Sequence, residues 1–235
     1  MAPTNAELTY CMNAHPGATV DELETALFHA APAVWREFDR LTGARGPHPL
    51  GVWFAAETAA HYDNPERIQH LRTRLQQAGL HVITLNGFPY GPFHGQRVKR
   101  AVYRPNWAED ARLTYTLSLA RILAGLLPEG GFGTISTLPV AYAAEADEAT
   151  LEQAVDNLMK AVRALHELQR DTGRTIQLAL EPEPDCCLED TATAVAFYRD
   201  RLQQRGLTAL ARACCTDKAG VRRVLRRHLG VCLDL

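Results

Sequence analysis

The sequence lacks the features that mark membrane, secreted and nucleic-acid-binding proteins. No apolar stretch approaches the ~20 residues that a membrane-spanning helix needs, so we expect no membrane span. The opening segment, MAPTNAELTYC, has no basic stretch followed by an apolar core, so we expect no signal peptide. The formal net charge of −2 argues against the basic surface that nucleic-acid binding requires. A local basic run, RRVLRRH at 222–228, is interpreted as a solvated helix face.

Cysteine is present, but without the spacing of a disulfide framework or a zinc site. The chain has six cysteines, of which Cys186–Cys187 and Cys214–Cys215 are adjacent pairs, and it contains no C-x-x-C. No base stands near any of them in the sequence, which disfavours a nucleophilic cysteine. Reduced thiols in a cytoplasmic protein are the simplest interpretation.

What the sequence does have is a regular alternation of short apolar strands and longer amphipathic helices. Six short runs, most of them apolar throughout, are typical of strands that are covered on both faces of a parallel sheet. These predicted strands cover residues 7–13, 50–56, 81–87, 132–140, 175–182 and 231–235.

Capping residues and helical periodicity place helices between these strands. Thr19 and Glu22 have the spacing of a capping box, and Asn64 followed by proline is typical of a helix start. Gly79 and Gly173 stand where two of the helices are expected to end. The predicted helices cover residues 19–41, 64–79, 107–127, 148–172, 190–206 and 216–230.

The repeated strand–helix units predict one α/β domain over residues 1–235, with a parallel sheet and right-handed crossovers. A doubly wound sheet and a (β/α)8 TIM barrel both fit the pattern. A barrel needs eight strands, whereas six are visible, and the final GVCLDL stops inside an apolar run. Either the sheet is open, or the chain is truncated before the last two units.

Polar side chains follow nearly every predicted strand at its carboxyl end, where parallel α/β sheets bind ligands. An apolar strand often leads into a polar loop, but six strands that all do so are hard to explain without a ligand. The residues in question are Asn13, His15, Glu57, Asn86, Tyr90, His94, Ser136, Thr137, Glu181, Glu183 and Asp234. We predict substrate contacts from Asn13, His15, Asn86, Tyr90, His94 and Glu183.

The segment IQLALEPEP, residues 176–184, carries the strongest signal, because an apolar strand ends in two carboxylates. Pro182 keeps Glu181 extended, so Glu181 and Glu183 fall on the same face. Glu181 and Asp234 supply hard oxygen ligands for Mg²⁺ or Mn²⁺, or part of a mixed set with histidine for Zn²⁺. We predict both as metal ligands; the alternative is a salt-bridged loop carboxylate.

Two glycine-containing loops differ in what they indicate. The segment GFPYGPFHG, residues 87–95, is rich in glycine, proline and aromatic residues, which favours an ordered substrate lid that carries His94. The segment GGFGTI, residues 130–135, precedes a strand instead of joining a strand to a helix, so we reject a nucleotide-binding fingerprint.

Several segments together resemble the EboE-type metabolite traffic proteins. They are LTYCMNAHPG, TLNGFPYGPFHGQRVKRAVYRPNW, STLPV, LALEPEP and GVCLDL, and the similarity spans nearly the whole chain. That family belongs to the xylose isomerase-like TIM barrel superfamily, so the resemblance implies a TIM barrel that is truncated after about six βα units. It also implies a divalent metal held by a glutamate after one strand and an aspartate after the next, at Glu181 and Asp234.

The resemblance implies three alternative functions. The first is a metal-dependent isomerase or epimerase for a small polyhydroxylated metabolite, with Glu181 as both ligand and catalytic base. The second is a binding protein that handles a metabolite of an export-linked pathway without turnover. The third is a DNA-repair enzyme like endonuclease IV, which the net charge of −2 disfavours.

Overall fold

The computed structural model describes residues 7–94, 99–208, 210 and 218–233. Its centre is a six-stranded sheet in which every strand is parallel to its neighbours. The α/β class and the number of strands predicted from the sequence are therefore confirmed. The strands are β1 (Tyr10–Cys11), β2 (His48–Trp53), β3 (Leu80–Asn86), β4 (Phe132–Thr137), β5 (Thr175–Leu180) and β6 (Leu229–Val231).

The strands lie in the sheet in the same order as in the chain, from β1 to β6. A doubly wound sheet reverses its strand order near the middle, whereas successive neighbours are the arrangement of a barrel wall. Within the described residues no pairing joins β1 to β6, so this sheet is open. The strand expected at 231–235 is wrong in its bounds, since β6 ends at Val231 and residues 234–235 lie outside the description.

Helices connect the strands as the sequence predicts, with one addition. The connection after β2 contains a short helix, α3, which the sequence pattern does not reveal. The α-helices are α1 (Val20–Thr25), α2 (Ala31–Thr42), α3 (Ala56–Tyr62), α4 (Pro65–Gln77), α5 (Asp110–Leu126), α6 (Glu148–Thr172), α7 (Thr191–Ala196) and α9 (Lys218–His228). Wider π-type turns extend α1 and α7 over Ala26–Ala30 and Phe197–Gly206, and 3-10 turns cover Met12–Ala14, Lys99–Tyr103 and Ala143–Glu145.

The predicted capping residues are at the helix ends. Thr19 and Glu22 form a complete capping box at the start of α1. The Asn64 side chain accepts from two backbone amides in the first turn of α4. Gly173 ends α6 at a φ of 71°, a left-handed conformation in which glycine has no steric penalty. These caps satisfy backbone groups that a helix end leaves unpaired.

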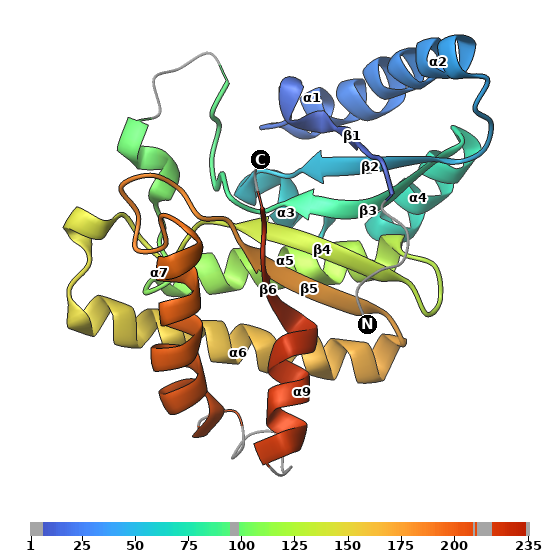
Figure 1. Ribbon diagram of the computed structural model, residues 1–235. Coiled ribbons are helices and arrows are strands. Elements are labelled where there is room, and N and C mark those ends of the chain that lie inside the picture. Colours follow the sequence, from blue (N-terminus) through green and yellow to red (C-terminus); the bar gives the residue numbers. More distant parts are fainter. Residues whose placement is uncertain (1–6, 95–98, 209, 211–217, 234–235) are drawn as a thin grey trace.

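The sheet has two faces of different character. Ile135, Leu178 and Leu180 are fully buried, and α5 and α6 pack against this side, as Figure 1 shows for β4 and β5. The opposite face, here called the inner face, carries the half-buried side chains of Thr84, Asn86, Thr134, Ser136 and Gln177. Burial of one apolar face supplies the main stabilisation of the domain, and the polar inner face is left available for other contacts.

The end of α9 carries a buried histidine. His228, the last residue of α9, is fully buried, and its Nδ1 donates to the backbone carbonyl of Ile176, 2.8 Å away. Burial holds the pKa of His228 below its usual value.

Among the helices of the described ranges, none combines the length and the apolar character that crossing a membrane requires.

Candidate functional site

The inner face carries two rows of polar side chains that run across neighbouring strands. In the first row, Thr84 pairs in register with Thr134, which pairs with Gln177, and the two threonine hydroxyls lie 2.7 Å apart. The second row lies two residues further along each strand, nearer the carboxyl edge. There Ser136 donates to the Oδ1 of Asn86 at 3.3 Å. Small hydroxyl and amide groups on neighbouring strands can bind the hydroxyls of a ligand.

Asn86 takes part in this site and also stabilises the chain that follows β3. Its Oδ1 accepts from the backbone amide of Phe88 at 2.9 Å, which fixes the turn after the strand. Within the described part of the chain its Nδ2 has no hydrogen-bond partner. This amide is therefore a donor that a ligand or water can use, and the substrate contact predicted for Asn86 stays a prediction.

An aromatic wall stands beside the second row. Trp53 pairs in register with Asn86, and its indole ring contacts Phe93 edge-to-face with the ring centroids 4.6 Å apart. His94 lies against the same indole, and its Nε2 donates to the backbone carbonyl of Asn13 at 2.7 Å. The structure thus brings the predicted residues Asn13 and His94 together, through a contact that fastens the loop after β3 to the turn after β1.

His15 and Tyr90 lie apart from the polar rows. His15 Nε2 is 2.7 Å from the hydroxyl of Tyr10, and its ring lines a hollow beside α1 together with Pro16. Tyr90 packs against Tyr115 of α5, with centroids 5.2 Å apart, and its carbonyl accepts from a backbone amide at the start of α3. Both contacts hold the loops in place, and the substrate contacts predicted for these two residues stay predictions.

Glu181 follows β5 directly and continues the sheet pattern. Its backbone amide donates to the carbonyl of Thr137 at 2.9 Å, and its side chain is half-buried. Because side chains alternate along an extended chain, Glu181 lies on the same face as Ala179, the neighbour of Ser136 in the second polar row. A carboxylate therefore stands at the carboxyl edge of the inner face.

Glu183 belongs to a separate cluster with Tyr103 and Cys186. Burial is the main cause that raises the pKa of Tyr103 to about 12, and the charges of Cys186 and Glu183 add to it. Burial likewise raises the pKa of Cys186 to about 12. A thiol that stays protonated at neutral pH lacks the thiolate of a catalytic nucleophile.

The described residues do not complete a metal centre. Within residues 7–94, 99–208, 210 and 218–233, no three His, Cys, Asp or Glu side chains come together as a metal ion would require. Of the two predicted ligands, Glu181 is at the end of β5, and Asp234 lies outside the described residues. No reaction step through a metal therefore follows from them.

Two residues that follow strands in the sequence lie outside the site. Glu57 is exposed on the first turn of α3, since the chain turns into this helix soon after β2. Thr137 is fully buried, and its neighbour on the same side, Ile135, belongs to the core. Of Ser136 and Thr137, the two residues singled out at the end of β4, alternation therefore places only Ser136 on the inner face.

Arg112 is a functional candidate that the sequence did not reveal. This residue of α5 is fully buried, and its guanidinium donates to the backbone carbonyls of Pro105, Gly87 and Phe88 at 2.8, 2.7 and 3.1 Å. Gly87 and Phe88 follow Asn86 directly, so Arg112 fixes the chain at the carboxyl edge of β3. An arginine within an apolar helix carries no sequence signal for such a role.

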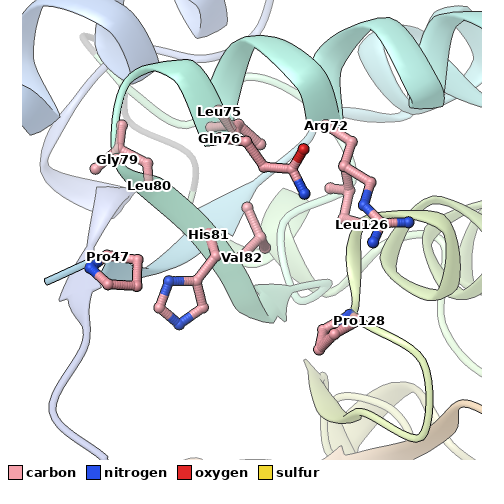
Figure 2. A pocket seen from close by; sticks show the side chains of 10 residues that line it. All are labelled: Pro47, Arg72, Leu75, Gln76, Gly79, Leu80, His81, Val82, Leu126 and Pro128. Carbon is pink, nitrogen blue, oxygen red and sulfur yellow. The ribbon is translucent and has the colours of Figure 1, made fainter.

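Figure 2 shows a hollow at the other edge of the sheet. It includes Leu80, the first residue of β3, and Pro47, which precedes β2. The carboxyl-edge residues described above do not line it, so this hollow is a different site.

No family model and no curated protein matches the chain. The function of the inner face is therefore considered from its geometry and from the sequence resemblance described above.

Proposed function

We propose that the inner face binds a small polyhydroxylated metabolite at the carboxyl edge of a barrel-type sheet. The observation that carries this proposal is the pair of polar rows, Thr84 with Thr134 and Asn86 with Ser136, on a face that is only half-buried. Hydroxyl and amide groups that alternate as donors and acceptors suit a ligand with several hydroxyls. The indole of Trp53 beside them is buried and packs edge-to-face on Phe93, so it supports the polar rows from behind.

The strand order supports a barrel-type architecture. Six parallel strands in chain order, with α5 and α6 on the outer side, are the arrangement of consecutive βα units in a TIM barrel. In such barrels the ligand binds at the carboxyl ends of the strands, which is the edge formed by Asn86, Ser136 and Glu181. The resemblance to the EboE-type proteins supports the same fold.

The finer part of the proposal is a metal-dependent isomerase or epimerase, as the xylose isomerase-like resemblance implies. A divalent cation would be held by Glu181 and Asp234, with Mn²⁺, Mg²⁺ or Zn²⁺ as candidates. The position of Glu181 at the binding edge supports this assignment.

Elemental analysis tests the metal. We expect the purified protein to hold one equivalent of a divalent metal, and Glu181→Ala to lose most of it. Glu129→Ala is the matched control, because Glu129 is an exposed carboxylate at the other end of β4. Equal metal content in Glu181→Ala and the control would refute the metal assignment and leave the sugar-binding proposal standing.

Ligand-observed NMR with a panel of aldoses, ketoses and their reduced forms tests the binding site. Thr134→Val keeps the size of the side chain but removes its hydroxyl, and we expect binding to weaken about two- to tenfold. Thr73→Val, on the exposed side of α4, is the control. If no sugar binds the protein, or if Thr134→Val binds as the wild type does, the proposed site is wrong.

A non-catalytic carrier is the second candidate, and one observation favours it. The two histidines predicted as substrate contacts are engaged in holding loops, His94 through Asn13 and His15 through Tyr10. Neither is arranged as a general base over the polar rows. Proton exchange into a bound sugar, followed by NMR in deuterated water, separates the two candidates, because an isomerase exchanges a carbon-bound proton and a carrier does not.

A further inference from the structure

The hollow in Figure 2 lies at the amino edge of the sheet, between the ends of α4 and α5. Its volume is about 290 Å³. Most of its surface is apolar, and three polar side chains complete it, namely Arg72 and Gln76 of α4 and His81 of β3. The apolar residues are Pro47, Leu75, Leu80, Val82, Leu126 and Pro128, with Gly79 between them.

Two of the polar side chains that line this hollow, Arg72 and Gln76, have no partner among the described residues. In the described part of the chain the Arg72 guanidinium makes no hydrogen bond and no ion pair, and neither does the Gln76 side chain. Other arginines of the same molecule do pair with carboxylates, including Arg74, two residues further along α4, which lies 2.7 Å from Glu24. Arg72 is thus a positive charge beside an apolar hollow, with its hydrogen-bonding capacity still available.

Three backbone carbonyls at the helix ends beside the hollow are, by contrast, already engaged. At the end of α4, the carbonyls of Arg74 and Gln76 accept from the backbone amides of Ala78 and Gly79. At the end of α5, the carbonyl of Leu127 accepts from the Arg174 side chain at 3.0 Å. A wall with free donors and occupied acceptors favours a ligand that is itself an acceptor.

Two contributions oppose an anion here, and both are smaller than that of the arginine. The carboxyl ends of α4 and α5 carry partial negative charge, which weakens anion binding about two- to fivefold. The carboxylate of Glu7 lies 3.5 Å from the Nε2 of His81, but its side chain is 56% exposed, so solvent screens its charge. A hydrogen bond from charged Arg72 strengthens binding about ten- to hundredfold.

We propose that this hollow binds a small carboxylic acid with an unbranched apolar body. The carboxylate pairs with Arg72 and Gln76, and the apolar body packs on Leu75, Leu126 and Val82. A volume of about 290 Å³ holds about ten non-hydrogen atoms at the ~30 Å³ that a water molecule occupies in the liquid. Octanoate, with eight carbons and two oxygens, has that size. The site is at the opposite edge from the sugar site and does not depend on it.

Octanoate titration, followed by ligand-observed NMR on the full chain, tests the proposal. Octan-1-ol and octylamine are the matched probes, because they keep the apolar body and change only the head group. We expect octanoate to bind the wild type in the millimolar range or tighter. Arg72→Gln removes the charge from an unpaired, partly exposed side chain, so the fold is retained, and we expect octanoate to bind ten- to hundredfold more weakly. Arg226→Gln, an exposed arginine of α9, is the control.

The outcomes are distinct. Preference for octanoate over octan-1-ol and octylamine, lost in Arg72→Gln and kept in Arg226→Gln, supports the site. A second variant, Gln76→Trp, fills the hollow from an exposed position, and we expect it to abolish binding of all three probes. The proposal is overturned if octanoate fails to bind at 10 mM or so, if octan-1-ol binds equally well, or if Arg72→Gln binds as the wild type does.

Discussion

The first prediction concerns Arg112, which fixes the chain that follows β3 at the carboxyl edge of the sheet. Its guanidinium is fully buried and is bonded to three backbone carbonyls, those of Pro105, Gly87 and Phe88. Its Nη2 is buried without a partner in the described part of the chain. Replacing it in Arg112→Met removes the charge and all three bonds while keeping an unbranched apolar side chain.

The size of the effect follows from two opposing contributions. Burial lowers the pKa of Arg112 from 12.5 to about 10, so the group is charged at neutral pH and its burial costs about 3 kcal/mol. Three hydrogen bonds from a charged donor contribute about 1.5–3 kcal/mol each, so their loss costs about 5–9 kcal/mol. The difference predicts that Arg112→Met lowers the free energy of unfolding by about 2–6 kcal/mol.

Urea denaturation measures this change. With a slope of about 3 kcal/mol per molar urea for a chain of this length, we expect the unfolding midpoint to fall by about 1–2 M. Arg163→Met is the control, since Arg163 is exposed and pairs with Glu167 one turn along α6; the expected loss is below about 0.5 kcal/mol. A loss below about 1 kcal/mol for Arg112→Met would show that the three carbonyls do not depend on this side chain.

Two further predictions concern buried positions. Gly87→Ala should cost about 1–3 kcal/mol, because an added Cβ would lie 2.9 Å from a backbone carbonyl of β4, whereas Gly91→Ala meets nothing within 4 Å; equal urea midpoints would contradict this. Since the pKa of His228 is held below 6.5 by burial, the unfolded chain binds a proton first, so stability falls as the pH drops below about 6.5. His228→Asn, which keeps a donor for the carbonyl of β5, should lose less stability between pH 7 and pH 5, and parallel urea midpoints of wild type and variant would refute the assignment.

Much of the fold could be predicted because its signals are local. The caps at Thr19, Asn64 and Gly173 are set by residues that lie within one turn of the helix end. Strand bounds are less local, since pairing decides them. The first strand was expected over 7–13, but only Tyr10–Cys11 pairs with β2. The α3 helix begins at Ala56, three residues after β2 ends at Trp53, and the predicted strand 50–56 extended over this start.

The site was predicted less completely, because side-chain partners come from distant parts of the chain. The carboxyl ends of the strands were the right place to look for polar residues, and Asn86 and Ser136 do meet there. What the sequence does not show is that His94 is engaged with Asn13, 81 residues away. Arg112 was missed for the same reason, since its acceptors belong to loops that lie beside α5 only in the folded chain.

The character of the inner face is what most directly connects this fold to binding. In the TIM-barrel architecture that we propose, the interior is normally filled by layers of branched apolar side chains. Here the first row is Thr84, Thr134 and Gln177, and the second is Asn86 and Ser136, all of them polar. An unsatisfied hydroxyl in a dry core would be costly, yet Thr84 and Thr134 bond to each other, Ser136 donates to the amide oxygen of Asn86, and all four residues are only half-buried. The inner face is therefore stable in contact with water. A polar ligand can take the place of water there, because the hydroxyls of the strands keep their hydrogen bonds across the sheet.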